Sequence, residues 1–570
     1  MKILGLRYGG HDSAATLMID GKIVAASSQE RHDYKKHSRA FPIDAAKDCL
    51  KTAGLKMNDL NEIAFANDSR YHIKEFYLKQ ALEDEDRIAF LVNDVDRIKQ
   101  HYEMESIVRE HTGFNGPVKF YRHHLCHLSS AYYPSGFNEA VLISLDGMGE
   151  IETGMYATGK NGKIDVIYED TKYPDSLGLI YSAMTFYLGW RNHCDEGIIM
   201  GLASYGNPHA KIPNSEMTYY ELFSDIIQEE GKYGYFINKD WIVYDKVRNK
   251  WVSDKFYDLL GPKRDYEKDE ITEHHQHIAA ALQLRLETIV LKHLRTLREE
   301  TGLNKLCIAG GVGLNCSMNG AIEQSGIFDE IFVQPASGDD GSTLGACFMA
   351  AKNAGLDIKP EKDHNYYLGT VFSEEEIKNA VISSGMTYSK PENLYQATTK
   401  LLAKGEIIAW HQGRSEFGPR ALGNRSILTK PFPSSMKDYI NARVKFREEF
   451  RPFAPAVLKE KCSEYFDINQ ESPHMLIACH VQPDKKEEIP AVVHTDNTCR
   501  VQTVGEDNNF RFRKLLEAFY EETGVPVLLN TSFNVKGQPI VNTPEEAIAC
   551  FKSTAIDSLV VGDYILSKNS

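Results

Sequence analysis

The chain has 570 residues, 42% of them apolar and 25% charged, which is typical of a soluble globular protein and argues against disorder. Its 65 basic and 80 acidic residues give a net charge of −15, which argues against nucleic acid or an anionic membrane as a general partner. No apolar run is long enough for a membrane span, the N-terminus does not resemble a signal peptide, and the ten cysteines include no CxxC pair. We therefore expect a cytoplasmic, multidomain enzyme with reduced thiols.

Predicted strands and helices alternate through the first part of the chain. Apolar runs at 3–6, 15–18 and 23–26, separated by Gly9-Gly10 and Asp20-Gly21, predict three strands, whereas 40–115 has helical spacing throughout. A buried strand is expected at 140–145, a long helix at 268–300, and then two strand–loop–helix units up to about residue 355. This order predicts an α/β fold. The polar segment 354–365 is the expected linker to a second domain, with a strand at 526–530 and a closing helix at 544–553.

The motif HHLCH is the first candidate site. If this segment is helical, His123 and His127 lie four residues apart on one helix face, where two imidazoles can bind one metal ion. Asp146 ends the predicted strand at 140–145, and Asp339 lies between a strand and a helix. Two histidines with two carboxylates suit iron, manganese or zinc, and the sequence does not choose among them. The alternative is a pair of core or surface histidines.

Three glycine-rich loops, each after a predicted strand, form the second candidate site. They are Gly9-Gly10, Asp146-Gly147-Met148-Gly149 and Gly310-Gly311-Val312-Gly313 with Asn315. Glycine lets a ligand approach the backbone closely, and the set suits a nucleotide held between two lobes. None of them is a dinucleotide fingerprint or a P-loop, and a tight strand-to-helix turn explains 310–315 equally well.

The third candidate is a basic segment, 413–451, with nine basic and four acidic residues and hence a charge of +5 in an acidic chain. Its arginines alternate with Gly, Pro and Phe, which favours a pocket for a compact anion over a solvated face or a nucleic-acid surface. A fourth candidate is the loop 529–537, which is dense in amides and hydroxyls. It suits a small polar substrate or a phosphate, or is a plain Asx/Ser turn.

Together these motifs resemble one family, the O-carbamoyltransferases of the NodU/CmcH type, essentially from end to end. The matching segments include GGHDSAA (9–15), HHLCH (123–127), SLDGMGE (144–150), AGGVGLNC (309–316), SGDDGSTLGA (337–346), GRSEFGPRALGNRSI (413–427), KFREEFRPFAP (445–455) and LLNTSFNVKGQPIV (528–541). The resemblance implies a TsaD-like domain with a sugar-kinase/actin-like fold at 1–358 and an α+β, YrdC-like domain at 359–570.

The resemblance also implies a two-step reaction. The C-terminal domain would make carbamoyl-adenylate from carbamoyl phosphate and ATP with Mg²⁺, and the N-terminal domain would transfer the carbamoyl group to an alcohol. The implied site residues are His123, His127, Asp146 and Asp339 as ligands of iron(II) or another divalent metal, His11 and Asp12 on the acceptor side of the transfer site, Gly147, Gly310, Gly311 and Asn315 at the nucleotide, and Lys445, Arg451, Arg500, Arg420, Ser532 and Asn534 at the carbamoyl phosphate and adenylation site. A neutral histidine near the acceptor hydroxyl is the expected general base.

The chain departs from the family pattern at two positions: Ile198 replaces the usual lysine, and Ser204 replaces the usual proline. The alternatives are an actin-like ATPase or sugar kinase, a non-catalytic nucleotide-binding protein, and a tRNA-modifying enzyme of the threonylcarbamoyl type. Carbamoyl transfer is favoured because neither of the first two gives the basic segment a role, and the acidic balance argues against tRNA. The resemblance implies a homodimer, a small-molecule acceptor, and neither nucleic acid nor membrane as a partner. The sequence does not identify the acceptor.

Overall fold

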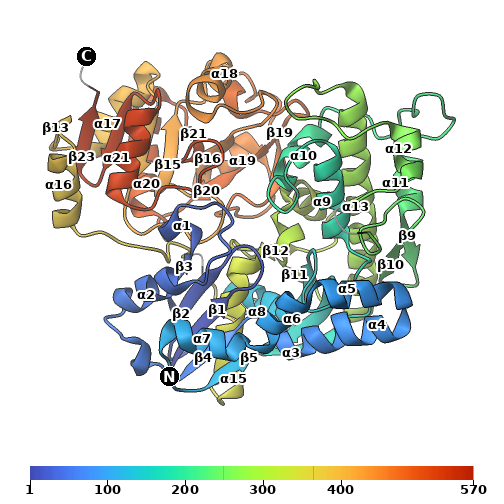
Figure 1. The fold of residues 1–570 in the computed structure, drawn as a ribbon. Coiled ribbons are helices and arrows are strands. Elements are labelled where there is room, and N and C mark those ends of the chain that lie inside the picture. The colour runs from blue at the N-terminus through green and yellow to red at the C-terminus, as the bar shows by residue number, and fades with distance from the viewer. Residues whose placement is uncertain (248–249, 364, 569–570) are drawn as a thin grey trace. The chain divides into compact units, whose positions relative to one another are not determined.

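The computed structural model describes residues 1–247, 250–363 and 365–568, so position 364 of the predicted linker lies outside the described residues. The chain forms two compact units (Figure 1). Unit 1 contains residues 1–23, 39–43 and 55–362, and unit 2 contains residues 24–38, 44–54 and 363–570. Two short N-terminal segments therefore group with the C-terminal part of the chain. Within the described residues, no helix is both long and apolar enough to cross a membrane.

The two five-stranded sheets of the N-terminal part have the same topology and lie in unit 1, apart from residues 24–28 at one edge of the first sheet, which group with unit 2. The first has the order β3-β2-β1-β4-β5, and the second the order β12-β11-β6-β7-β8. In each, the first strand pairs antiparallel with the next strand of the chain on one side and parallel with a later strand on the other. The fifth strand extends the parallel side. This repeat is the topology of the sugar-kinase/actin-like fold, so the α/β prediction is confirmed. The strands are β1 (Lys2–Arg7), β2 (Ala14–Ile19), β3 (Lys22–Ser28), β4 (Glu62–Phe65), β5 (Val118–Phe120), β6 (Glu139–Leu145), β7 (Gly154–Lys160), β8 (Lys163–Tyr168), β11 (Lys305–Ala309) and β12 (Glu330–Val333), with a separate hairpin of β9 (Ile227–Glu230) and β10 (Gly234–Ile237).

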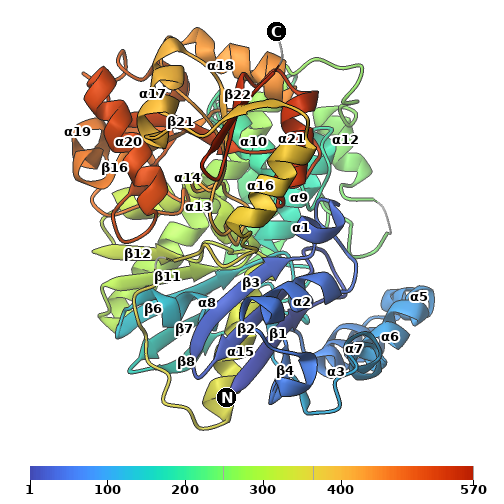
Figure 2. The same cartoon turned by 90° about the vertical axis from the view of Figure 1, so that its left-hand side faces the viewer.

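Helices α8 (His123–Ser135) and α15 (Ser342–Asn353) pack against each other between the two sheets (Figure 2). Helix α15 covers β1, β2 and β4, whereas α8 covers β6, β7 and β11. The helices approach so closely that a Cβ on Gly345 would lie 1.7 Å from the carbonyl oxygen of Cys126. The other helices are α3 (Ser69–His72), α4 (Gln80–Glu83), α5 (Ile88–Asn93), α6 (Val95–Tyr102), α7 (Met104–Thr112), α9 (Leu177–Tyr187), α10 (Glu196–Ala203), α11 (Tyr219–Ile226), α12 (Asp254–Leu260), α13 (Glu273–Thr301) and α14 (Cys316–Gln324).

The prediction that 40–115 is helical throughout is wrong at one place. Strand β4 lies within this range and pairs with β1 and β5 in the first sheet. Its four residues are all buried, so it lacks the alternation of apolar and polar residues that marks a half-exposed strand. The predicted strands at 3–6, 15–18, 23–26 and 140–145 and the long helix are present as β1, β2, β3, β6 and α13.

Unit 2 is built on an eight-stranded mixed sheet with the order β13-β23-β22-β14-β15-β21-β16-β20, beside a three-stranded sheet of order β17-β18-β19. Its core includes Trp410, Leu428, Phe512 and Leu528. The strands are β13 (Thr387–Ser389), β14 (Ile408–His411), β15 (Arg425–Thr429), β16 (Ala454–Leu458), β17 (Phe466–Asp467), β18 (Ala478–Val481), β19 (Thr498–Arg500), β20 (Gln502–Val504), β21 (Val527–Ser532), β22 (Ser558–Val561) and β23 (Tyr564–Ser567). The helices are α1 (Glu30–Asp33), α2 (Ile43–Thr52), α16 (Glu374–Ser383), α17 (Leu394–Lys404), α18 (Ser435–Ile440), α19 (Cys462–Tyr465), α20 (Phe510–Thr523) and α21 (Pro544–Ser553). The strand expected at 526–530 and the helix expected at 544–553 are β21 and α21.

Candidate functional site

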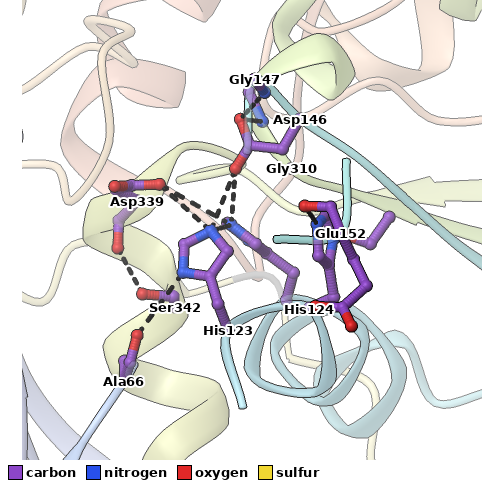
Figure 3. A network of polar contacts seen from close by, with 12 residues as sticks. Ala66, His123, His124, Asp146, Gly147, Glu152, Gly310, Asp339 and Ser342 are labelled. Carbon is purple, nitrogen blue, oxygen red and sulfur yellow. Dashed lines mark hydrogen bonds and ion pairs between the residues drawn. The ribbon is translucent and has the colours of Figure 1, made fainter. Parts of the chain in front are cut away.

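Four side chains of unit 1 converge on one point (Figure 3). His123 and His127 lie in the first two turns of α8, Asp146 follows β6, and Asp339 lies just before α15. The Nε2 atoms of the two histidines are 2.9 Å apart, and Asp146 Oδ2 lies 3.1 Å from His123 Nε2 and 3.2 Å from His127 Nε2. Asp339 Oδ1 lies 3.4 Å from His123 Nε2 and 3.9 Å from His127 Nε2. One nitrogen or oxygen of each residue therefore faces the others.

These spacings fit a single bound metal ion. Ligand atoms about 2.1 Å from one ion lie roughly 3.0 Å apart at a right angle and roughly 3.4 Å apart at the tetrahedral angle. The separations among the histidine nitrogens and the carboxylate oxygens given above, from 2.9 to 3.9 Å, span these values, and the four atoms all lie within 4.8 Å of one another. The two imidazoles and two carboxylates that the sequence predicted to act together are therefore brought together, and the donor set suits a divalent transition metal.

Each carboxylate uses its other oxygen for hydrogen bonds to the protein. Asp146 Oδ1 accepts from the backbone N–H groups of Gly147, at 2.7 Å, and Gly311, at 3.2 Å. Asp339 Oδ2 accepts two bonds from the guanidinium of Arg7, at 2.7 and 3.1 Å. Burial alone would raise the pKa of Asp146, but hydrogen bonds from both histidines outweigh it and hold the pKa well below its usual range. Both carboxylates are thus in the ionised form that binds metal.

The three histidines of the motif have different environments. His123 turns Nδ1 toward the carbonyl oxygen of Ala66, 3.5 Å away, so its Nε2 faces the site. Burial lowers the pKa of His127, but hydrogen bonds to Asp146 and Asp339 raise it to about 9. His124 points elsewhere, with Nδ1 2.8 Å from Ser144 Oγ and Nε2 2.9 Å from the carbonyl oxygen of Glu152. Burial lowers the pKa of His124 to about 3, so it is a neutral structural residue.

Glu150 is a buried acid beside this site that the sequence did not single out. Its carboxylate accepts hydrogen bonds from the backbone N–H groups of His123, at 2.9 Å, and Asp68, at 2.7 Å. It therefore satisfies the first turn of α8, where the N-cap residue Arg122 gives no side-chain cap. The motif SLDGMGE contained this residue, but its role depends on a contact with a helix 27 positions earlier in the chain.

His11 and Asp12 lie in the loop after β1, with His11 Nδ1 2.8 Å from Asp12 Oδ2. The ring of His11 also stacks on that of His193 at a centroid distance of 6.0 Å. Burial lowers the pKa of His11, but the hydrogen bond to Asp12 and the charges of Asp339 and Asp146 raise it to about 9. At neutral pH this histidine carries a proton, which does not favour the expected role of a neutral general base.

The residues expected at the nucleotide all have structural roles in unit 1. Gly310 has φ +88°, and a Cβ there would lie 2.2 Å from the carbonyl oxygen of Leu145. The N–H groups of Gly147 and Gly311 bind Asp146. Asn315 caps α14 through the N–H of Met318 and pairs with the amide of Gln283. The glycine-rich loops therefore support the carboxylate site directly.

Lys445 in unit 2 lies among the residues predicted to assist it. Its Nζ lies 2.8 Å from Asn534 Oδ1 and 3.2 Å from Ser532 Oγ, and it donates to the carbonyl oxygens of both residues. Ser532 Oγ in turn donates to Asn534 Oδ1 at 2.7 Å. Burial, followed by the charges of Arg447 and Arg451, holds the pKa of Lys445 well below its usual range.

Three arginines of unit 2 lie close to one another. Burial, followed by the charges of Arg451 and Arg500, holds the pKa of Arg447 well below its usual range. Arg451 lies 3.6 Å from Glu448 Oε2, and the buried Nε of Arg500 has no hydrogen-bond partner in the described part of the chain. Arg447 was among the nine basic residues of the segment but was not assigned to the site. The charges of Arg451 and Arg500 thus act on Arg447 in a buried place, and a guanidinium group is well suited to bind a carboxylate or phosphate.

Two other arginines of the basic segment, Arg414 and Arg425, bind backbone carbonyl groups, so the prediction that the segment lines a pocket is wrong for these two. Arg425 is completely buried and donates to the carbonyl oxygens of Gln412, Gly413, Asn424 and Asn542. Arg414 donates to those of Val24, Leu368 and Gly369. Arg420 is half-buried in a loop held by Glu416, whose Oε1 accepts from the N–H groups of Leu422, Asn424 and Arg425.

The two departures from the family pattern lie in and after α10. Ile198 is 5% exposed and belongs to the core of unit 1, and α10 packs on α13. Ser204 is the C-cap residue of α10. A lysine ammonium at position 198 would lose its hydration in this packing, which accounts for an apolar residue there.

Comparisons with known proteins agree over both halves of the chain. A family model described as "Carbamoyltransferase N-terminus" matches residues 2–348, and one described as "Carbamoyltransferase C-terminus" matches residues 399–568. The nodulation protein NolNO of Sinorhizobium fredii is 36% identical over 574 residues, which cover 98% of this chain and 79% of that protein. The 3'-hydroxymethylcephem-O-carbamoyltransferase of Streptomyces clavuligerus is 36% identical over 288 residues, which cover 50% of this chain and 53% of that protein.

Among solved structures, component A of the (R)-2-hydroxyglutaryl-CoA dehydratase of Acidaminococcus fermentans matches at 15% identity with a TM-score of 0.34, covering 62% of this chain and 99% of that one. Full-length HypF matches at 13% identity with a TM-score of 0.31, covering 62% of this chain and 56% of that one. The two family models together span most of both units, and the relatives include nodulation proteins and an O-carbamoyltransferase. The chain is therefore a transferase of the NodU/CmcH carbamoyltransferase family.

Proposed function

We propose that the protein is an ATP-dependent O-carbamoyltransferase that works in two steps. In the first, residues 359–570 convert carbamoyl phosphate, ATP and one water molecule into carbamoyl-adenylate, phosphate and pyrophosphate: water releases phosphate from carbamoyl phosphate, and the resulting carbamate displaces pyrophosphate from ATP. In the second, residues 1–358 transfer the carbamoyl group from the adenylate to a hydroxyl group of a small natural product, and AMP leaves. The observation that carries the proposal is the convergence of His123, His127, Asp146 and Asp339 in a chain of this family.

The cationic cluster of unit 2 supports the first step. Carbamoyl phosphate is a compact dianion with little apolar surface, so its binding must come mainly from charge-assisted hydrogen bonds. We propose that Lys445, Arg451 and Arg500 hold its phosphate, while Ser532 and Asn534 orient the adenylation site and Arg420 adds a further cation. The low pKa of Lys445 supports this, because a bound dianion would supply the counter-charge that the cluster lacks.

The metal-ligand cluster of unit 1 supports the second step. A divalent metal, for which we propose iron(II), would supply a Lewis acid for the carbamoyl oxygen. The adenylate would lie against the backbone of Gly147, Gly310, Gly311 and Asn315. His11 and Asp12 would lie at the acceptor. Because His11 is protonated at neutral pH, it would donate a hydrogen bond first and accept the proton of the acceptor hydroxyl only after losing its own.

The relatives support a small-molecule acceptor, since one of them is named for O-carbamoylation of a hydroxymethyl group on a cephem. Carbamoyl-adenylate reacts with water, so its formation and use within one protein would protect it.

The test is to incubate the protein with ATP, Mg²⁺ and carbamoyl phosphate and to separate the nucleotide products. We expect AMP and pyrophosphate that depend on carbamoyl phosphate. Formation of ADP without any need for carbamoyl phosphate would instead show an ATPase or kinase. Elemental analysis of anaerobically purified protein addresses the metal: we expect stoichiometric iron, and stoichiometric zinc without iron would contradict that assignment.

A further inference from the structure

The two carboxylate oxygens of Asp339 face different partners, Arg7 on one side and the site histidines on the other. Oδ2 accepts from Arg7 Nη2 at 2.7 Å and from Arg7 Nε at 3.1 Å. Oδ1 faces the histidines, 3.4 Å from His123 Nε2. Both the Arg7 and the Asp339 side chains are less than a tenth exposed, at 9% and 8%. The ion pair is therefore shielded from solvent, which strengthens it relative to a surface pair.

Asp146 is held in the same way, but by the backbone. Its Oδ1 accepts from the N–H groups of Gly147 and Gly311, and its Oδ2 faces both histidines. Each carboxylate thus offers one oxygen to the site. The donors to Asp146 belong to the backbone, whereas the donor to Asp339 is a side chain that a substitution can remove directly.

Arg7 is well placed to fix this orientation. It is the last residue of β1, a central strand of the first sheet, and its backbone pairs with that of Ala14 in β2. Two N–H groups of a planar guanidinium on one oxygen oppose rotation of the carboxylate, which a single point charge would not. The loop after β1 packs closely against the Arg7 side chain, since a Cβ added to Gly10 would lie 3.3 Å from Arg7 Nη2.

We propose that Arg7 is a positioning residue for the metal site: it holds Asp339 Oδ2 so that only Oδ1 is presented to the metal. This inference rests on the proposed metal site. Residues that orient a metal ligand typically change metal affinity 10- to 100-fold when they are removed. The expected direction is informative, because loss of a positive charge alone would strengthen the binding of a dication. If an Arg7 variant binds the metal more weakly, the cause is therefore the lost orientation of Asp339 and not the lost positive charge of Arg7.

The experiment uses Co²⁺ as the probe with the full-length wild type, Arg7→Met, Arg7→Lys and the control Arg285→Met. Arg285 is a matched control: it is buried, binds Glu229 at 3.1 Å and the carbonyl oxygen of Ile227, and lies in α13. We expect Arg7→Met to bind Co²⁺ about 10- to 100-fold more weakly than wild type, Arg7→Lys to lie between them, and Arg285→Met to match wild type. The visible spectrum of Co²⁺ should also change in Arg7→Met, because Asp339 is then free to use either or both oxygens.

The outcomes separate this inference from the proposed function. If the wild type binds neither Co²⁺ nor Fe²⁺, the metal site itself is wrong. If the wild type binds Co²⁺ and Arg7→Met binds it equally or more tightly with the same spectrum, the positioning role of Arg7 is overturned. If Arg7→Met does not fold, Arg7→Lys decides: weaker Co²⁺ binding at a wild-type melting temperature supports the role, and unchanged binding overturns it.

Discussion

The Nε2 atoms of His123 and His127 face each other at 2.9 Å, a hydrogen-bond distance, so one of the two nitrogens carries a proton between them. Asp146 Oδ2 lies within 3.2 Å of both nitrogens. His127, whose pKa is raised to about 9, carries this proton. A metal that binds both nitrogens must displace this proton.

The first prediction concerns the pH dependence of metal binding. Below pH 9, His127 is protonated before the metal binds, so binding releases a proton and the apparent affinity rises with pH. For one proton the rise is about tenfold per pH unit, and it should level off as the pH passes about 9. Co²⁺ titrations between pH 6 and 8 in several buffers, with proton release measured by calorimetry, check this. Affinity that is constant over the range would show that His127 is not a protonated ligand.

A second prediction separates the two steps. His127→Ala and Asp339→Ala should lose bound metal and carbamoyl transfer but keep carbamoyl-phosphate-dependent formation of AMP and pyrophosphate, because the ligands lie in unit 1 and the cationic cluster in unit 2. His293→Ala is the control, since His293 is a buried histidine of unit 1 that binds Tyr156 and not the site. Transfer at the wild-type rate in Asp339→Ala would show that the site is not catalytic.

The carboxylate and histidine cluster was predictable because each member has a local signature. His123 and His127 have helical spacing, and Asp146 directly follows an apolar strand whose end lies at a sheet edge. Arg7 has no such signature: its partner is 332 positions away, and an arginine at the end of a strand is ordinarily exposed. Strand β4 was missed for a different reason: its four buried residues are too few to show the alternation of apolar and polar residues that marks a strand.

The sequence could not distinguish the arginines expected to bind an anion from those with structural roles. Arg425 and Arg500 are the same residue type in similar polar surroundings. The guanidinium of Arg425 nevertheless donates hydrogen bonds to backbone carbonyl oxygens, whereas the Nε of Arg500 has no hydrogen-bond partner in the described part of the chain. The difference depends on contacts such as that of Arg425 with Asn542, 117 positions away, which form only in the folded state.

The third prediction tests why position 310 is a glycine. Gly310→Ala combines a left-handed φ of +88° with a Cβ 2.2 Å from the carbonyl oxygen of Leu145, so it should lower the free energy of unfolding by roughly 2–5 kcal/mol. Gly302→Ala is the control, because Gly302 has φ +68° and no atom near its Cβ position, and should cost only about 1 kcal/mol. Chemical denaturation of the full chain compares them. Equal stability losses would contradict the steric explanation and favour a ligand-binding role for Gly310.

The last prediction concerns the anion site of unit 2. Arg500→Ala should raise the concentration of carbamoyl phosphate needed for AMP formation at least tenfold, since a charge-assisted hydrogen bond contributes about 1.5–3 kcal/mol. The free energy of unfolding should stay the same or rise, because the substitution relieves the repulsion between Arg500 and Arg447 and the buried Nε of Arg500 has no hydrogen-bond partner in the described residues. Arg425→Ala is the matched contrast: it removes bonds to four backbone carbonyls in a fully buried place, so it should destabilise unit 2 strongly.

The control for Arg500→Ala is transfer from supplied carbamoyl-adenylate. This step uses the ligand cluster of unit 1, so the variant should carry it out at the wild-type rate, and its requirement for the acceptor alcohol should not change. Inorganic phosphate gives a second readout: it should compete with carbamoyl phosphate in the wild type and compete less in the variant, because both dianions need the same guanidinium groups. A variant that fails on carbamoyl-adenylate as badly as on carbamoyl phosphate would place Arg500 in transfer and contradict the division of labour between the two units.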